Sequence, residues 1–459
     1  MPAVIWALVH DGRIIHIEGE GDIGGGRAPD ASSIFRIASM TKSFTAATIL
    51  LLRDQGLLRL DDLIVDILPW TATIGVRRDW APITVRDLLT MAAGFPTDDP
   101  WGDRQESLPL ADFDALIATG LTFCRPPRTG WEYSNLGYAL LGRVIATVTG
   151  GTYVDVVRSS LLEPLGMSSS GYDPRLLPAE HVAIGHHPHG NELVPEQLIT
   201  PGAFSPMGGL LSSIADLAIW VGGFQAAWVA ETGPDSPAHP LSRSSRREMQ
   251  EPLRLARTEL ITDAPSPIAI TTCYGYGLAV EERSDHGRFI HHSGGYPGFG
   301  SHMRWHPGSG WGVIALGNRT YARMQLMATE LLNAVVADSG GSLATTARGH
   351  LPCEPWPVTL QAMEAVDDLL DTWDDAQADA WFAMNMDLDQ PRALRRAAIA
   401  ELMTSIGPAT RGPVTSRTPA HARWERHGVS GSLAIEILMS PTSPPHIQSL
   451  TVTALPAPR

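Results

Sequence analysis

The stretch F-R-I-A-S-M-T-K-S-F-T-A-A-T-I-L-L-L, residues 35–52, says most about the fold of this chain. From Ser39 to Leu52 nearly every residue after the first turn is apolar or small, which predicts a buried helix ending near Gly56. Such a helix has no face suited to water. The rest of the chain must therefore build a large core around it.

Ser39 and Lys42 open this predicted helix three positions apart, so their side chains share one face. A serine hydroxyl becomes a nucleophile when a base takes its proton, and a lysine can be that base when burial lowers its pKa. The backbone N–H groups at a helix start also suit a developing oxyanion. The structural alternative is an ordinary serine cap beside a solvated lysine.

A second motif, Tyr133-Ser134-Asn135, lies in a predicted turn before the apolar helical stretch 131–146. A tyrosine can pass a proton to a leaving group. An asparagine can bind a substrate amide carbonyl through its NH₂ and steady a lysine through its oxygen. The structural alternative is a packed tyrosine and an asparagine that caps the helix.

A third motif, H-S-G-G at 292–295, follows a predicted strand. Small residues at a strand edge allow a substrate backbone to lie alongside, which gives Ser293 and Gly294 a binding role. The Gly295 N–H, together with that of Ser39, could complete an oxyanion hole. The alternative is a hairpin turn with a surface histidine at His292.

Strands are predicted at both ends of the first 338 residues, with helices between them. Residues 3–10 and 13–19 form a hairpin around Asp11-Gly12. A later antiparallel meander is predicted at 276–283, 288–292, 299–306 and 311–317, followed by a helix over 318–337. For the sheet to be contiguous, the first hairpin must join the late strands. The predicted class is α+β, with an antiparallel sheet and a helical insertion.

The composition changes between residues 338 and 357, where Gly, Ser and Pro accumulate. We therefore expect a domain over 1–345, a linker over 346–357 and a small α+β module over 358–459. Helical spacing followed by alternating strands makes this module similar to cystatin-like or NTF2-like folds. It is expected to restrict access to the site or to support a homodimer.

Taken in order, Ser-x-x-Lys, Tyr-x-Asn and His-Ser-Gly resemble the motifs of the serine β-lactamase and penicillin-binding-protein superfamily. The stretches L-L-E-P-L-G-M and H-H-S-G-G-Y-P-G-F support the resemblance, which covers residues 2–338. The superfamily includes class C β-lactamases, D-alanyl-D-alanine carboxypeptidases, D-aminopeptidases and family VIII esterases. The resemblance implies an antiparallel sheet flanked by helices, an all-helical region, and a site between the two.

The resemblance also implies roles for individual residues. Ser39 would be the acylated nucleophile, Lys42 its general base, Tyr133 the proton relay and Asn135 the contact to the substrate amide. His292 would stand where β-lactamases have a lysine. Because histidine is mostly neutral at pH 7, this difference favours the carboxypeptidase, aminopeptidase and esterase members over efficient β-lactam hydrolysis.

Two other segments bear on this resemblance. Met91-Ala92-Ala93-Gly94 stands where many relatives have a His-Thr/Ser-Ser-Gly run, and we expect only a change in packing. Arg319 and Arg323, near the last predicted strand, are candidates for binding a substrate carboxylate, with simple solvation as the alternative. Loops near 95–130, 185–206 and 231–270 are expected to set the shape of the pocket.

The composition limits the classes of binding partner and cofactor that we expect. The charge of −15, from 34 basic and 49 acidic residues, argues against nucleic acid and anionic membrane surfaces. Three scattered cysteines form neither a disulfide framework nor a metal site, and the run His186-His187-Pro188-His189 has no second ligand cluster. We expect no metal and no organic cofactor. The sequence shows no signal peptide, so the cytoplasm is expected, or the periplasm or exterior if a leader was removed.

These observations predict a serine hydrolase that acts on a small-molecule ester, amide or peptide through an acyl group on Ser39. A D-amino-acid amide or a carboxylic ester is the expected substrate. The alternative is a β-lactamase, or a penicillin-binding sensor that is acylated and releases the acyl group slowly.

Overall fold

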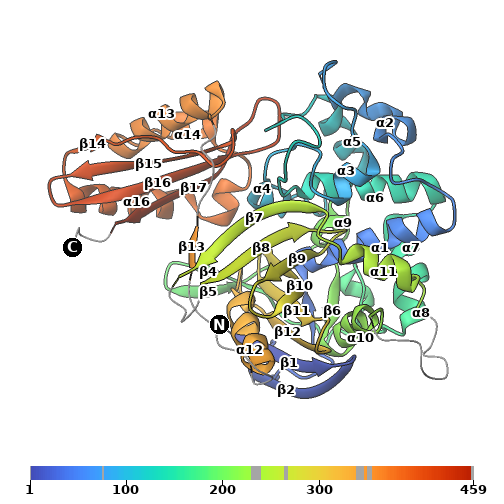
Figure 1. The fold of residues 1–459 in the computed structure, drawn as a ribbon. Coiled ribbons are helices and arrows are strands. Elements are labelled where there is room, and N and C mark those ends of the chain that lie inside the picture. Colours follow the sequence, from blue (N-terminus) through green and yellow to red (C-terminus); the bar gives the residue numbers. More distant parts are fainter. Residues whose placement is uncertain are drawn as a thin grey trace.

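The structure is a computed structural model that describes residues 2–74, 77–228, 239–262, 267–337, 346–348 and 354–455. Within these residues, one large sheet with its helices occupies the N-terminal part, and a smaller sheet with four helices forms the C-terminal part (Figure 1). Cys353 and part of the expected linker, 349–353, lie outside the described residues.

The large sheet has nine antiparallel strands in the order β13-β7-β8-β9-β10-β11-β12-β1-β2. Strand β1 pairs with β12 in the register Val4↔Gly317, so the first hairpin joins the late strands, as predicted. The strands are β1 Ala3–His10, β2 Arg13–Gly21, β7 Arg254–Ile261, β8 Ile268–Tyr274, β9 Ala279–Arg283, β10 Gly287–Tyr296, β11 Phe299–His306, β12 Trp311–Gly317 and β13 Thr346–Arg348.

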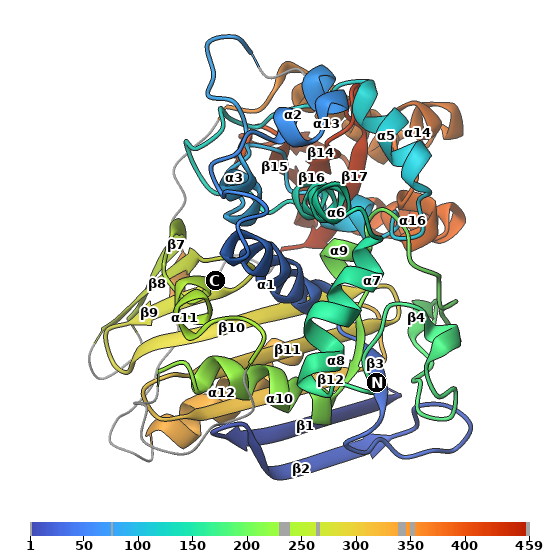
Figure 2. The same cartoon turned by 90° about the vertical axis from the view of Figure 1, so that its right-hand side faces the viewer.

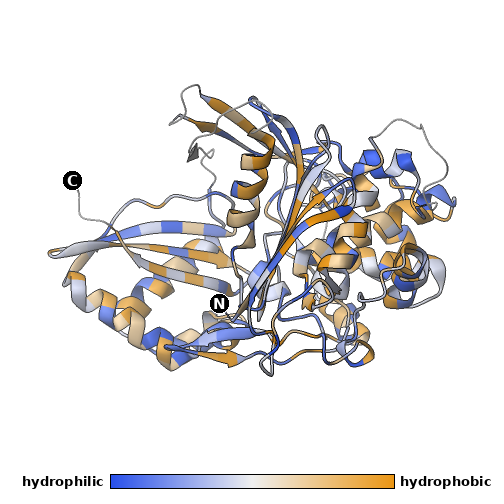
Figure 3. Ribbon diagram, turned by 90° about the horizontal axis from the view of Figure 1, so that it is seen from below, coloured by the Kyte–Doolittle hydropathy of each residue, from blue (hydrophilic) through white to orange (hydrophobic). Residues whose placement is uncertain are grey.

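Both faces of this sheet are covered by helices, because its central strands place apolar side chains on each face. Ala3, Ile5, Ala7 and Val9 of β1 point into the main core, whereas the intervening residues pack toward helix α12, Met324–Ala337. Helix α10, Ile214–Gln225, and helix α1, Thr41–Asp54, lie on the opposite face (Figure 2). Hydropathy colouring shows the alternation along the strands and the one-sided helices (Figure 3).

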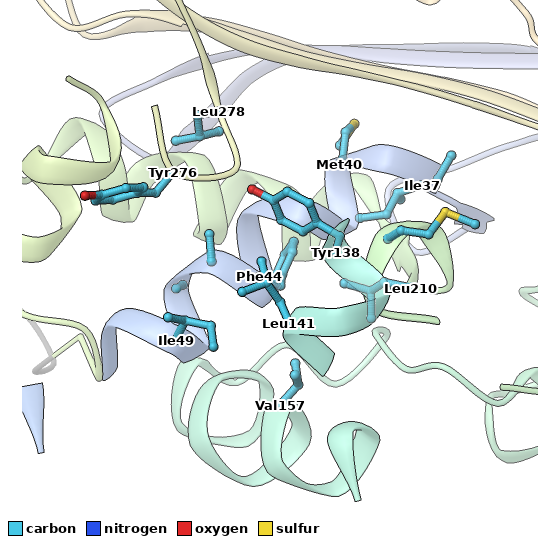
Figure 4. Close-up of a cluster of buried hydrophobic side chains, with 14 of the residues drawn as sticks. Ile37, Met40, Phe44, Ile49, Tyr138, Leu141, Val157, Leu210, Tyr276 and Leu278 are labelled. Atoms are coloured by element: carbon cyan, nitrogen blue, oxygen red, sulfur yellow. The ribbon is translucent and has the colours of Figure 1, made fainter. Parts of the chain in front are cut away.

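The predicted buried helix is α1, Thr41–Asp54, preceded by a 3₁₀ turn at Ala38–Met40. Eleven of its residues are buried, and Phe44 stacks on Trp220 with ring centroids 3.9 Å apart. Tyr138 and Leu141 of helix α6 pack beside α1 (Figure 4). The surrounding helical region contains α2 Ile64–Ile67, α3 Val85–Leu89, α4 Asp99–Gly102, α5 Leu110–Ala118, α6 Asn135–Thr149, α7 Tyr153–Val157, α8 Glu163–Leu165 and α9 Ser205–Gly208.

Two strands of the large sheet, β7 and β8, were not predicted from the sequence. The N-terminal elements that remain to be described are short. Strand β7 was not predicted, because its alternation includes charged residues such as Arg254, Arg257 and Glu259 near the sheet edge. Strand β8 has no charged residue and was missed because it begins within the stretch 231–270 that was expected to be loop. Within the expected linker, β13 joins that edge by pairing with β7. The short elements are β3 Ile34–Arg36, β6 Leu211–Ser213, β4 His186–His189, β5 Glu192–Pro195 and α11 Arg243–Met249.

The C-terminal module has a core of its own, in which Trp424 and Ile435 are almost fully buried. Its four antiparallel strands, in the order β14-β15-β16-β17, carry helices on one face. Its elements are α13 Pro357–Asp371, α14 Asp375–Trp381, α15 Met386–Asp389, α16 Arg392–Ile406, β14 Ala409–Arg411, β15 His421–Gly428, β16 Gly431–Met439 and β17 Ile447–Ala454. Cys124 of the N-terminal part packs into this core, so the two parts share an interface.

No single helix among the described residues is long and apolar enough to cross a membrane. Within the same described ranges, one pair of neighbouring helical stretches, Asn135–Thr149 and Tyr153–Leu165, is long and apolar enough when taken together, but the two are bent by 79° to one another.

Candidate active site

Ser39 lies in the 3₁₀ turn between β3 and α1, with 7% of its surface exposed. Ala38, directly before it, has a φ of 49°, which is unusual for a residue with a side chain. The turn is held from one side by a buried ion pair, in which Arg36 Nη1 lies 2.7 Å from both carboxylate oxygens of Glu106. Tyr296, at the end of β10, donates its hydroxyl to the same carboxylate.

Lys42 is fully buried one helical turn after Ser39. Its Nζ donates to Ser39 Oγ at 2.9 Å, to Asn135 Oδ1 at 2.7 Å and to the Met207 carbonyl at 2.8 Å. Burial lowers the pKa of Lys42 from 10.5 to about 8, although nearby carboxylates oppose this shift. A substantial fraction of neutral lysine is therefore present near pH 8, and neutral lysine can accept a proton from Ser39.

Tyr133 and Asn135 reach the same point from the start of α6. Ser134 caps this helix by accepting from the Gly137 N–H at 3.1 Å, which directs the residues on either side toward Lys42. Lys42 Nζ lies 4.8 Å from the centroid of the Tyr133 ring, and the Tyr133 hydroxyl interacts with Ser39. Burial holds the pKa of Tyr133 well above 10, so its phenol keeps its proton.

Three aspartates surround this group, and sequence analysis did not single them out. Asp98 accepts from the backbone N–H groups of Asn135 and Leu136 at 2.6 and 2.9 Å, and Asp99 accepts from Asn135 Nδ2 at 2.9 Å. Asp103 accepts from the Tyr321 hydroxyl at 3.0 Å. Burial raises the pKa of all three, that of Asp98 to about 7. The run D-D-P-W-G-D at 98–103 was the available signal.

His292 is buried on β10, and both of its ring nitrogens are engaged. Nδ1 lies 2.6 Å from the Ser293 carbonyl oxygen and must donate to it, so Nε2 is the acceptor for the Tyr274 hydroxyl at 3.0 Å. Burial and the charge of Lys42 lower the pKa of His292 to about 3. The ring is therefore neutral at ordinary pH and supplies no charge for a substrate carboxylate.

The H-S-G-G motif brings β10 directly against the turn that carries Ser39. A Cβ on Gly294 would collide with the Ile37 carbonyl oxygen and the Ser301 hydroxyl, so only glycine fits there. A Cβ on Gly295 would lie 2.8 Å from the Tyr321 ring. Ser293 Oγ lies 2.9 Å from His302 Nδ1. The structure thus brings together all eight residues that the sequence pointed to.

A cavity of about 570 Å³ opens over Ser39. Its wall includes residues from the N-terminal sheet, from the α4 segment and, through Arg417, from the C-terminal module. Of the loops expected to shape it, 95–130 and 231–270 contribute and 185–206 does not. Residues on the wall that sequence analysis did not single out include Asp99, Asp103, Arg257, Tyr274, Tyr321 and Arg417.

The remaining sequence candidates lie outside this cavity. Met91 packs under the Tyr133 turn, where its sulfur accepts from the Ser134 N–H at 3.3 Å, in line with the expected packing role. Arg319 and Arg323 are exposed and are not among the residues that line the cavity. No group of three or more His, Cys, Asp or Glu side chains suited to a metal ion occurs in the described part of the chain.

Comparisons with protein families and with curated proteins point to the same group of relatives. The family model described as Beta-lactamase matches residues 1–336. Penicillin-binding protein 4* of Bacillus subtilis (strain 168) is 28% identical over 301 residues, which cover 63% of this chain and 61% of that protein. Protein flp of Staphylococcus aureus (strain NCTC 8325 / PS 47) is 26% identical over 326 residues, 69% and 60% of the two chains. The chain thus spans about 60% of the length of these curated relatives.

Solved structures share the fold. The octameric penicillin-binding protein homologue from Pyrococcus abyssi superposes with a TM-score of 0.61 at 21% identity, covering 95% of this chain and 86% of that one. The class C β-lactamase from Rhodobacter sphaeroides gives 0.56 at 18% identity, covering 73% and 95%. The family match covers most of the chain and the fold agrees with it. The protein is therefore a member of the β-lactamase family of serine hydrolases, the superfamily of the penicillin-binding proteins and class C β-lactamases.

Proposed function

We propose that this protein hydrolyses small amides or esters whose acyl group carries an ammonium group, such as D-amino-acid amides and short peptides. The observation that carries the reaction type is the buried Lys42 Nζ, 2.9 Å from Ser39 Oγ in a cavity large enough for such a substrate. The carboxylates on the cavity wall support the choice of substrate.

The reaction follows from the positions of three side chains. Neutral Lys42 takes the proton of Ser39, whose oxygen attacks the substrate carbonyl carbon. As the tetrahedral intermediate collapses, the bond to the leaving group breaks and Tyr133 delivers a proton to the departing nitrogen or oxygen. Lys42, which holds the proton taken from Ser39, passes it to Tyr133, whose ring centroid lies 4.8 Å from its Nζ. Water then attacks the acyl carbon and gives a proton to neutral Lys42. The bond between Ser39 Oγ and the acyl carbon breaks, the carboxylic acid leaves, and Lys42 returns the proton to Ser39.

The cavity wall favours a cationic substrate on one side. Asp99 and Asp103 line the cavity near Ser39, and the Oδ1 atom of Asp103 has no hydrogen-bond partner among the described residues. Neutral His292 gives no positive charge there. An ammonium group would bind the two carboxylates and favour their ionised forms, since an opposite charge lowers a carboxyl pKa.

A second candidate function has its own observation. Arg257 and Arg417 line the same cavity from β7 and from the C-terminal module. They could receive a carboxylate, which a β-lactam or a peptide with a free C-terminus would supply. This arrangement keeps a β-lactamase or a slowly deacylating penicillin-binding protein as the alternative.

The test combines labelling with a matched pair of substrates. A fluorophosphonate should add once to the wild-type protein and not to Ser39→Ala, as measured by intact mass spectrometry. D-alanine p-nitroanilide should be cleaved faster than its N-acetyl derivative, which lacks the charge. Asp103→Asn should lower kcat/KM for the free amine by about tenfold to a hundredfold, since a bond to a charged group contributes ~1.5–3 kcal/mol.

Each result has a clear meaning for the proposal. Equal rates for the two anilides, unchanged by Asp103→Asn, would contradict the ammonium preference and leave the hydrolase assignment intact. Turnover of nitrocefin in the same plate, with neither anilide cleaved, would favour the β-lactamase alternative. A nitrocefin adduct that persists would favour the slow sensor.

The pH dependence of kcat/KM should report Lys42. Its pKa of about 8 predicts that the rate rises with pH, changes about tenfold per unit below pH 8 and levels off above it. The high pKa of Tyr133 predicts no loss of rate below pH 10 from that phenol. A profile measured with p-nitrophenyl acetate between pH 5 and 10 tests this. An inflection near 6.5 would instead indicate a histidine and contradict the assignment.

A further inference from the structure

We propose that Gln448 of the C-terminal module is a positioning residue for the reaction centre, acting through helix α4 and Asn135. The inference rests on the proposed function, since it concerns the rate at which Ser39 is acylated. It goes beyond that function by giving the C-terminal module a part in the chemistry, in addition to its place on the cavity wall.

Gln448 connects the two parts of the molecule through a single buried side chain. It lies at the start of β17 and is 1% exposed. Its Nε2 donates to the Thr97 carbonyl at 2.7 Å and to the Met439 carbonyl of its own module at 2.8 Å. Its Oε1 accepts from the Trp101 N–H at 3.1 Å. One amide thus binds the chain just before α4 and the third residue of that helix, which lies beside β17 (Figure 1).

Helix α4 cannot hold this position by itself. It has only four residues, and the side chain of Asp98, at its N-cap, makes no capping bond to it. Short helices of this kind are stable only when tertiary contacts fix them. A second contact to the C-terminal module lies just after α4, where Arg104 Nε pairs with Asp389 at 2.8 Å. Arg104 also pairs with Glu196 of the N-terminal part at 2.9 Å, and the Trp101 ring packs edge-on against Phe204.

The position of α4 sets the position of Asn135. Asp98 and Asp99 accept from the backbone and the side-chain amide of Asn135, as described above. Gly102 approaches so closely that a Cβ there would lie 2.9 Å from the Asn135 Cβ. The segment therefore holds Asn135 by hydrogen bonds on one side and by direct packing on the other.

Asn135 in turn orients the base. Its Oδ1 accepts from Lys42 Nζ at 2.7 Å, and the same nitrogen contacts Ser39 Oγ. A shift of α4 away from α6 would carry Asn135 with it and remove one of the three acceptors that fix Lys42. Misplacing a catalytic group by about 1 Å can cost about 10²-fold in rate. A glutamine in the second domain thereby affects proton transfer at Ser39.

The test compares Gln448→Met with Thr122→Val. Methionine fills a similar volume and removes all three hydrogen bonds of Gln448. Thr122→Val removes an inter-domain bond to the Thr442 carbonyl, 2.8 Å long, that does not involve α4. We expect Gln448→Met to slow fluorophosphonate labelling of Ser39 by about tenfold to a hundredfold, with kcat reduced more than KM changes. Its pH profile should depart from the wild-type inflection. Thr122→Val should match the wild type in labelling rate, in kcat and KM, and in pH profile.

The outcomes separate this inference from the proposed function. If the wild type is labelled and Gln448→Met, folded by circular dichroism, is labelled at the rate of Thr122→Val, the positioning role is wrong and the hydrolase proposal stands. If the wild type itself is not labelled, the proposed function fails. Should Gln448→Met not fold, Asp389→Asn, which weakens the second contact between the α4 segment and the C-terminal module, decides the question by the same labelling rate.

Discussion

Lys42→Met should lower kcat/KM for the best substrate by about 10³-fold, within the 10²–10⁴-fold that general-base catalysis contributes. The reason is that Lys42 Nζ is the only basic nitrogen described within hydrogen-bonding distance of Ser39 Oγ. Methionine keeps the length of the side chain and cannot accept the proton. Stopped-flow acylation with a p-nitrophenyl ester measures the step directly.

The matched control is Ser39→Ala, which should abolish labelling while Lys42 stays in place. A Lys42→Met protein that still acylates within about tenfold of the wild type would show that another group takes the proton. Tyr133 would then be the next candidate, because its hydroxyl also interacts with Ser39. Restoration of part of the rate by added primary amines would support the assignment to Lys42.

Glu106→Gln should destabilise the N-terminal domain by about 3–5 kcal/mol, the cost of leaving a buried charge without its partner. Arg36 is 1% exposed, and both Glu106 oxygens lie 2.7 Å from its Nη1. The substitution leaves the guanidinium charge buried with a neutral amide. Urea unfolding followed by tryptophan fluorescence measures the change in the free energy of unfolding.

An exposed ion pair provides the control for this prediction. Arg158 and Asp155 are both 57% exposed and 2.7 Å apart, and such pairs contribute about 0–1 kcal/mol. Arg158→Gln should therefore change stability little. If Glu106→Gln were equally mild, the buried pair would not be what secures the turn that carries Ser39.

The reaction centre could be predicted from sequence because its motifs are local. Ser39 and Lys42 share a helix face by spacing alone, and Tyr133 and Asn135 flank a serine that caps the next helix. The contiguous sheet followed from the alternation in β1 and in the late strands. The resemblance to a known family predicted that the three motifs come together in one site.

The wall of the cavity could not be predicted in the same way. The charged alternation of β7, R-L-A-R-T-E-L-I, conceals a strand next to the sheet edge, because one of its faces is exposed to solvent. Gln448 and Arg417 belong to the C-terminal module, and no spacing in the sequence relates them to Ser39. The low pKa of His292 could not be predicted either, because it results from the burial of the ring and from the charge of Lys42.

Because Arg417 lies on the wall of the cavity, the candidate site is built from two separate segments of the chain. In the proposed reaction, the groups that make and break bonds come from residues before 338, whereas the β14–β15 loop supplies Arg417 to the wall of the cavity. Selection or engineering can therefore alter substrate choice by varying that loop while the nucleophile and its base stay untouched. Substrate range and chemical rate can in this way evolve along separate routes within one polypeptide.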